Sequence, residues 1–245
     1  MAQLSVVAEE VELSDPMLVE GFPGVGLVGK LAADHLVEAL DLVHYANVHC
    51  ETLPKVAVYQ PDTAEVASPV RLYASESGDL VVLQSDVPVE PDAAEAFADC
   101  FTPWLEANAT PVFVAGEPTQ ERDLPPAVSG VAAGDAESLL SEVGLSTPSE
   151  RGAMSGPTGA LLAHAVERDL PAVGLIVESD PQFPDPTAAR ALLSEAILPL
   201  TGYEVPLESL VEQAEEIQEA KQGLAQQMGD AGDQSSKATP FRMYQ

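Results

Sequence analysis

A glycine-rich segment near the start of the chain has residue types and spacing that could bind a phosphate group. Residues 21–30 read GFPGVGLVGK, which joins a Gly-x-Gly-x-x-Gly fingerprint to a lysine directly after its last glycine. In a P-loop the residue after that lysine holds Mg²⁺ through a hydroxyl group, whereas here Leu31 follows Lys30. A dinucleotide site also needs an acidic residue at the end of the next strand, about 20 residues further on, and the segment HYANVHC is a poor candidate for that strand.

The alternative to a nucleotide site is a structural role for these glycines. Because glycine has no side chain, it permits sharp turns and lets a helix pack closely on a sheet. The sequence therefore predicts a structural loop, with no nucleotide or other cofactor, whose glycines are Gly21, Gly24, Gly26 and Gly29.

Polar residues in the C-terminal half could form a catalytic or anion-binding site. The turn at 152–159 precedes a predicted helix, and backbone N–H groups at a helix N-terminus can hold an anion. Two carboxylates follow a predicted strand, where open α/β sheets place their sites. Structural roles are equally open to them: a helix cap, a turn or interface carboxylate, or a surface ion pair. The candidates are Arg151, Ser155, Thr158, Glu178 and Asp180, and none of the serines has the Gly-x-Ser-x-Gly context.

Short apolar, β-branched runs alternate with helical patterns along the chain. The predicted strands are 17–20, 43–48, 56–60, 70–74, 80–84, 111–115 and 172–177. The predicted helices are 28–40, 92–108, 136–143, 158–169, 186–198 and 207–228. This alternation predicts an α/β domain with a mostly parallel central sheet and helices on both faces. The turns between the strands of 43–84 are too short for crossover helices, so we expect that part to be antiparallel and the sheet to be mixed.

The charge balance is extreme, with 40 acidic residues against 10 basic ones and a net charge of −30. Such a surface repels phosphate backbones and anionic lipids, so neither nucleic acid nor membrane is expected as a partner. The acidic residues are spread along the whole chain, which favours adaptation to a high-salt cytoplasm, as in a halophilic archaeon. The N-terminal segment lacks the basic-then-apolar pattern of a signal peptide, which agrees with a cytoplasmic protein.

The cysteines and histidines do not form a recognisable metal or disulfide pattern. We expect Cys50 and Cys100 to be small buried apolar residues, because an intracellular chain of this length needs no disulfide. The four histidines show no metal-ligand spacing with carboxylates. We expect His35 to lie in the core or at a contact.

The chain divides into one α/β domain at 1–205, a helix at 206–229 and a tail at 230–245. Spacings of three and four residues define a heptad seam in the helix. This helix either lies on its own domain or associates between subunits. The apolar seam consists of Leu207, Leu210, Ala214, Ile217, Leu224 and Met228, with the polar Lys221 among them.

The tail ends in an apolar residue, a penultimate tyrosine and a final residue: Met243, Tyr244 and Gln245. This is the pattern by which proteasome-binding proteins dock on the outer ring of the core particle. The preceding segment, DAGDQSSKATP, has almost no apolar side chains and is typical of a linker. The alternative is an ordinary frayed terminus.

The segment 21–40, GFPGVGLVGKLAADHLVEAL, resembles the signature of the proteasome assembly chaperone family. The segments 90–104, 152–162, 172–190 and 207–228 resemble later parts of that family in the same order, so the resemblance reaches about residue 228. The chain departs from the family pattern in its acidic surface. Some family members lack the C-terminal tail.

This resemblance implies a fold like that of purine nucleoside phosphorylases, no established catalytic site, and a homo-oligomer, with a trimer preferred. It implies a non-enzymatic assembly chaperone, or a proteasome-binding factor whose tail reaches the outer ring. The fold analogy leaves a second possibility open, an enzyme of nucleoside phosphorylase or hydrolase type with its site near the 152–159 turn and Glu178.

Overall fold

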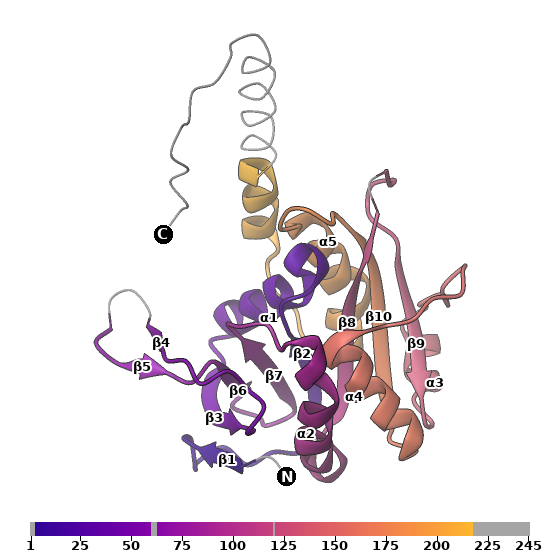
Figure 1. Ribbon diagram of the computed structural model, residues 1–245. Helices are drawn as coiled ribbons and strands as arrows, with labels where there is room; N and C mark the ends of the chain where they lie inside the picture. Colours follow the sequence, from indigo (N-terminus) through magenta and orange to yellow (C-terminus); the bar gives the residue numbers. More distant parts are fainter. Residues whose placement is uncertain (1–2, 60–62, 120, 218–245) are drawn as a thin grey trace, which may run out of the picture.

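A computed structural model describes residues 3–59, 63–119 and 121–217, and its central element is a large mixed β-sheet (Figure 1). Among these residues the sheet contains eight strands in the order β1-β3-β6-β7-β2-β8-β10-β9. Helices cover both of its faces. The α/β class and the mixed sheet predicted from the sequence are therefore confirmed.

Four parallel strands form the centre of the described sheet: β2 (Met17–Gly21), β7 (Leu80–Ser85), β8 (Thr110–Pro118) and β10 (Ala172–Ser179). Each is a nearly continuous apolar run, because both faces of these strands are covered by helices. All four end at the same edge of the sheet, so the loops that follow them meet there.

Antiparallel strands complete the sheet on both sides. β1 (Gln3–Val6), β3 (Val43–His49) and β6 (Val70–Ala74) follow β7, and β9 (Val128–Ala133) pairs with β10. β1 and β9 are not among the strands predicted from the sequence. β9 reads VSGVAA, in which small residues replace the usual β-branched run, and Leu140 packs where a side chain at Gly130 would stand.

Two helical layers enclose two hydrophobic cores. α1 (Val28–Ala39), α3 (Glu137–Glu142) and α5 (Pro186–Leu192) pack on one face, and α2 (Ala94–Asn108) and α4 (Gly156–Glu167) on the other. The first helical layer is continued by a π-helical turn, Leu193–Ile197, and by α6 (Leu198–Thr201). Short 3-10 turns precede two of the helices, at Val25–Leu27 and Pro91–Ala93. No helix of the described residues is long and apolar enough to cross a membrane.

Between β3 and β6 the chain leaves the body of the molecule as an arm, which we define as residues 51–59 and 63–69 (Figure 1, left). It contains β4 (Val58–Tyr59) and β5 (Val66–Ala67), which pair with each other as a separate two-stranded sheet. The predicted strand 56–60 is thus reduced to two residues within the part of the arm that is described.

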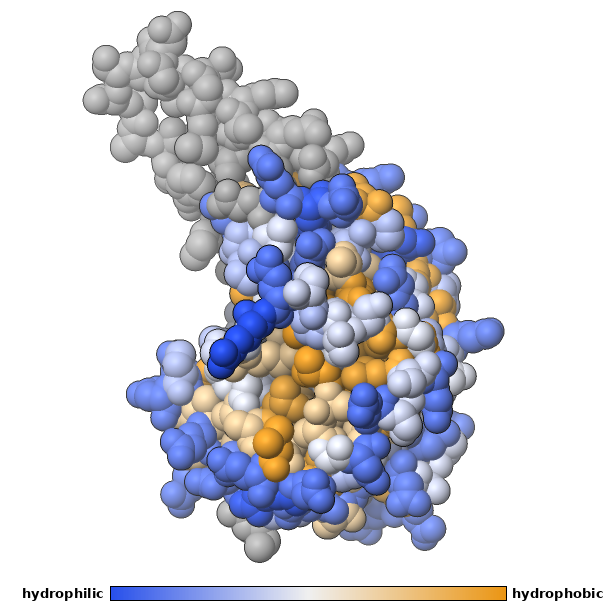
Figure 2. Space-filling view, turned by 90° about the vertical axis from the view of Figure 1, so that its right-hand side faces the viewer, coloured by the Kyte–Doolittle hydropathy of each residue, from blue (hydrophilic) through white to orange (hydrophobic). Residues whose placement is uncertain are grey.

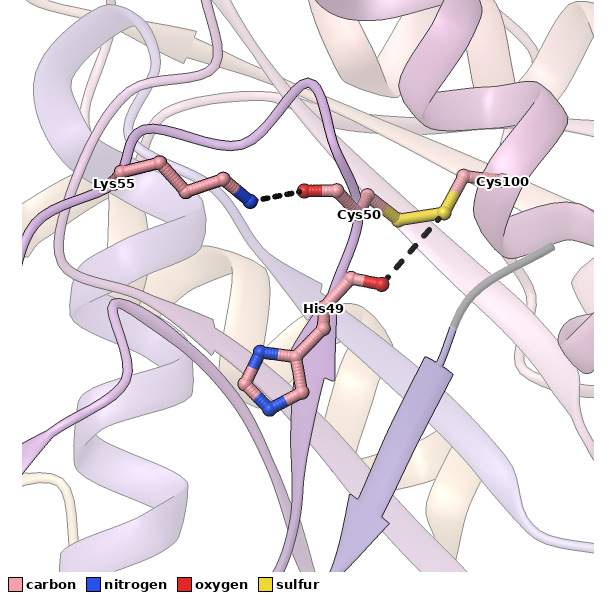
Figure 3. Close-up of a disulfide and its surroundings, with 4 residues drawn as sticks. All are labelled: His49, Cys50, Lys55 and Cys100. Atoms are coloured by element: carbon pink, nitrogen blue, oxygen red, sulfur yellow. Dashed lines mark hydrogen bonds between the residues drawn. A yellow bond between two sulfur atoms is a disulfide. The ribbon is translucent and has the colours of Figure 1, made fainter.

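A disulfide joins the end of β3 to α2, between Cys50 and Cys100 (Figure 3). The two Cα atoms lie 6.2 Å apart. The prediction of two separate apolar cysteines was therefore wrong. It rested on chain length and cellular compartment, and neither reveals that β3 ends beside α2. The carbonyl oxygen of Cys50 also accepts a hydrogen bond from Lys55 at 3.2 Å.

The C-terminal helix begins on the surface of its own domain. Residues 208–217 are helical, and Leu210 is only 1% exposed because it packs in the hydrophobic core that includes residues of α1 and α5. The carbonyl oxygen of Pro206 lies 2.7 Å from Nε2 of His35 on α1, and this histidine is buried, which agrees with the core position expected as one of its two alternatives. Lys221, Leu224 and Met228 of the predicted seam lie outside the described residues.

Candidate functional site

A cavity of about 1050 Å³ opens at the edge where the parallel strands end. It lies between the glycine loop after β2 and the 152–159 turn that leads into α4, with β8 and β10 behind it. Figure 2 views the molecule from the side of α3, α4 and β9, where hydrophobic residues form a band between hydrophilic ones. The apolar walls include Phe22, Val25, Met154, Leu162, Val166 and Ile176.

The cavity has its position because two central strands part. β2 pairs with β8 only from Met17 to Val19, while β2 continues along β7 and β8 continues along β10. The chain leaves β2 for α1 on one face, whereas the route from β8 leads through β9 and α3 to α4 on the other face. Open α/β sheets place their binding sites at such a topological switch point.

Glu20 fills the gap between the parting strands, and its side chain is buried. Oε1 accepts a hydrogen bond from the backbone N–H of Phe22 at 2.8 Å. Oε2 accepts one from the N–H of Val114 on β8 at 3.1 Å and one from the hydroxyl of Thr158 on α4 at 3.0 Å. One carboxyl group therefore joins β2, β8 and α4.

Burial makes the ionised form of Glu20 costly, because no water remains to solvate the charge. Desolvation therefore raises the pKa of Glu20 from 4.5 to about 7, although hydrogen bonds from Val114, Phe22 and Thr158 act in the opposite direction. Thr158, and not Glu20, is among the residues that line the cavity. The carboxyl group of Glu20 therefore does not line the cavity but holds a residue that does.

Gly26 and Gly21 occupy positions in the glycine loop that have no room for a side chain. Gly26 has φ of +61°, and a Cβ there would lie 1.8 Å from the hydroxyl oxygen of Ser179 at the end of β10. Its carbonyl oxygen accepts the N–H of Asp185 at 2.8 Å, which ties this loop to the start of α5. A Cβ at Gly21 would lie 2.3 Å from Cβ of Ala33 on α1. Close packing of the loop accounts for these two glycines.

Lys30 is engaged by carboxylates on the protein itself. Its Nζ lies 2.9 Å from Asp34 one turn along α1, and 3.3 Å from Asp86 after β7. Asp86 also lies 2.7 Å from the buried guanidinium of Arg71, and Gln84 bridges Arg71 and Asp34. In a P-loop the corresponding lysine would be directed at phosphates.

The candidate catalytic residues do not converge on one pocket. Ser155 and Thr158 line the large cavity, whereas Glu178 lines a separate depression beside Arg122. Arg151 is exposed and is not among the residues lining either.

The carboxylates near the end of β10 and after it stabilise turns and the start of α5. Glu178 accepts the N–H of Ala127 at 3.2 Å, and Asp180 accepts the N–H of Gln182 at 2.8 Å. Asp185 caps α5 by accepting the N–H of Ala188 at 3.0 Å, and its carboxylate lies 2.5 Å from Arg122. Burial acts to raise the pKa of Asp185, but the hydrogen bonds from Arg122 and from backbone N–H groups outweigh it, so the pKa is lower than that of an ordinary aspartate.

The remaining predicted site residues lie in or beyond the C-terminal helix. Leu207 and Leu210 pack on the body of the molecule, and Ala214 and Ile217 are half-buried. Met243, Tyr244 and Gln245 lie outside the described residues. In the described part of the chain, no group of three or more His, Cys, Asp or Glu side chains could hold a metal ion.

Comparison of the sequence with protein-family models identifies the family of this chain. The model of the PAC2 family matches residues 18–225, which is most of the chain, so this protein belongs to the PAC2 family. In sequence it is similar to the uncharacterized protein MJ0106 of Methanocaldococcus jannaschii, with 24% identity over 95% of this chain and 94% of that protein.

Two crystal structures from Pyrococcus furiosus have a similar fold. PbaA, described as an archaeal homolog of proteasome-assembly chaperone, has a TM-score of 0.77 and 24% identity, and the alignment covers 94% of this chain and 99% of PbaA. PbaB, described as an archaeal proteasome activator, has a TM-score of 0.78 and 24% identity, with 91% and 98% covered. At this identity the likeness establishes the fold.

Proposed function

We propose that this chain is a non-enzymatic proteasome assembly chaperone or proteasome-binding factor that docks on the outer ring of the core particle. The observation that carries the proposal is the combination of a PAC2 domain with the C-terminal sequence Met243-Tyr244-Gln245. PbaA and PbaB, which have this fold, are described as a homolog of a proteasome-assembly chaperone and as a proteasome activator.

The chemistry of the terminal residues suits a pocket between ring subunits. Tyr244 offers a flat apolar ring and a hydroxyl group, and Met243 has a flexible side chain that adapts to an apolar wall. The α-carboxylate of Gln245 would pair with a cation in the ring, usually a lysine.

Several tails on one oligomer would bind more tightly than one tail, because each bound tail raises the effective concentration of the others. We therefore propose a homo-oligomer, with a trimer preferred. The net charge of −30 argues against nucleic acid and membrane as partners and suits a high-salt cytoplasm, as in a halophilic archaeon. Support for a role without catalysis comes from the turn and helix-cap contacts of Glu178, Asp180 and Asp185.

The test is co-sedimentation with purified core particle from the same organism in molar salt. The full chain should sediment with the particle, and a chain that stops at residue 240 should not. If both sediment equally, ring docking through the tail is wrong. If neither does, a proteasome partner is wrong.

A further inference from the structure

The arm has apolar side chains that are exposed in the described part of the chain. Val56 is 49% exposed, Val66 69% and Tyr59 83%. An isolated two-stranded hairpin is at best marginally stable in water, so one with strands this short needs a surface to rest on. Exposed apolar groups gathered on one projecting segment mark an interaction site.

The cavity is an apolar surface of the opposite shape. Its walls are mainly aliphatic, and Val166 on α4 is 64% exposed beside it. The charged residues among its described lining are Glu117 and Glu150. A basic residue next to apolar side chains would complement both features, and the arm carries Lys55 directly before Val56.

The arm of one chain lies away from its own cavity in this fold. The arm leaves the sheet at β3 and β6, whereas the cavity lies over β8 and β10, and β7 and β2 stand between them. Adjacent strands are about 4.8 Å apart, so three steps from β6 to β8 span roughly 14 Å. The arm also extends away from the body, on the side opposite β8 and β10 (Figure 1).

We propose that the arm of one copy of this chain docks in the cavity of a second copy, with Tyr59, Val56 and Val66 against the apolar walls and Lys55 near Glu117 and Glu150. Such a contact joins two different surfaces, so it builds a closed ring when the rotation between neighbouring copies closes. The contact gives the oligomer of the proposed function a structural basis, but it does not depend on binding to the proteasome.

Cross-linking tests the geometry directly. The Tyr59→Cys protein and the Val166→Cys protein would be purified separately, mixed in molar salt and oxidised. Among the described residues no cysteine is free, and both positions are exposed, so the fold should tolerate these changes. We expect a product of twice the chain mass that contains one copy of each variant. An oligomer that yields no such mixed product overturns the proposal.

Light scattering tests the energetics. Tyr59→Ser combined with Val66→Ser should lower the mass of the particle toward 25.7 kDa, the mass of one chain. The matched control is Val6→Ser combined with Val7→Ser, which removes apolar groups that are 45% and 53% exposed on another part of the surface. The control should keep the parent mass. A parent that is itself a monomer, or an arm variant that keeps the parent mass, contradicts the arm-to-cavity contact.

These experiments test the arm-to-cavity contact separately from the proposed binding to the proteasome. A chain that stops at residue 240 should keep its oligomeric mass while losing ring binding. An oligomer that ignores the arm changes but still binds the core particle would overturn only the arm-to-cavity contact.

Discussion

Glu20 is a buried carboxyl group that three donors hold between β2, β8 and α4. Glutamine at this position has a single acceptor oxygen, so Glu20→Gln must turn its NH₂ group toward at least one backbone N–H. We expect this to lower the free energy of unfolding by about 1–3 kcal/mol. Urea denaturation of the parent and the variant at pH 5 would measure the difference, and equal stabilities at that pH would contradict this role for the carboxyl group.

The cost of Glu20→Gln should depend on pH. The pKa of Glu20 is raised from 4.5 to about 7 in the fold, so its neutral form favours folding below pH 4.5 and that stability is lost as the pH rises through 7. This difference between the pKa values of the unfolded and folded states corresponds to about 3 kcal/mol in the free energy of unfolding. Because this loss is as large as the expected cost of Glu20→Gln, the cost should be largest near pH 5 and close to zero near pH 8. Urea curves at both pH values, in constant salt, that give one constant difference would contradict the raised pKa.

Gly26 and Gly24 form a matched pair within one loop. Gly26 has φ of +61° and meets Ser179, whereas a Cβ at Gly24 would meet nothing within 4 Å. Gly26→Ala should therefore cost about 2 kcal/mol or more, because it adds both backbone strain and a clash. Gly24→Ala should change the free energy of unfolding by less than about 1 kcal/mol. Thermal unfolding would compare the stabilities of the two variants. Similar losses of stability would contradict the requirement for glycine at position 26.

At the scale of elements, the glycine loop and α1 should not bind a nucleotide. Lys30 already pairs with Asp34 and Asp86, so millimolar ATP or NAD should leave the melting temperature unchanged. A ligand at 100 times its dissociation constant would add about 2.7 kcal/mol, which is easily detected. Lys30→Ala by itself should cost up to about 1 kcal/mol. A shift with ATP or NAD in the parent that disappears in Lys30→Ala would overturn this interpretation.

The start of the C-terminal helix should stabilise its own domain. Leu210 is 1% exposed and its neighbour Val211 is 41% exposed. Leu210→Ala should cost about 2–4 kcal/mol by leaving a cavity in the core, and Val211→Ala about 0.5 kcal/mol or less. Denaturation in urea would compare them. A small effect of Leu210→Ala would indicate that the helix does not rest on the domain.

Features that depend on neighbouring residues could be predicted from the sequence, whereas features that depend on distant residues could not. The parallel strands were predictable because their apolar runs are continuous, as in β7 with LVVLQS. β9 was not predictable because its residues are small, and it forms a strand by pairing with β10. Glu20 reads as the polar end of a strand, and its partner Thr158 lies 138 positions away. Thr158 was a candidate, but nothing in the sequence linked it to Glu20.

The same limit applies to the disulfide and to the cavity. Cys50 and Cys100 are separated by 50 positions and meet because β3 ends beside α2. The two glycine-rich segments at 21–29 and 152–159 were both recognised, but no local pattern shows that they face each other across one cavity. Contacts between elements come from the topology of the sheet, and the sequence specifies that topology only through the fold as a whole.

At the scale of the whole molecule, the proposed function combines a PAC2 domain with docking of Met243-Tyr244-Gln245 on the proteasome outer ring. Substitutions in the last residues should change ring binding and leave the domain unchanged, because the segment before them, DAGDQSSKATP, has almost no apolar side chains that could pack on the domain. Their effect should persist in molar salt, where screening over about 3 Å weakens exposed ion pairs more than apolar contacts.

The most direct measurement is binding of purified core particle to surface-captured protein in molar salt, comparing Tyr244→Ala with the matched variant Gln245→Ala. Tyr244→Ala should abolish or strongly weaken binding, because it removes the aromatic ring and the hydroxyl group. Gln245→Ala should bind like the parent, since only the terminal carboxylate of that residue is expected to take part. Parent-like binding by Tyr244→Ala, with the same melting temperature and particle mass, would contradict the central claim that this tail docks on the ring.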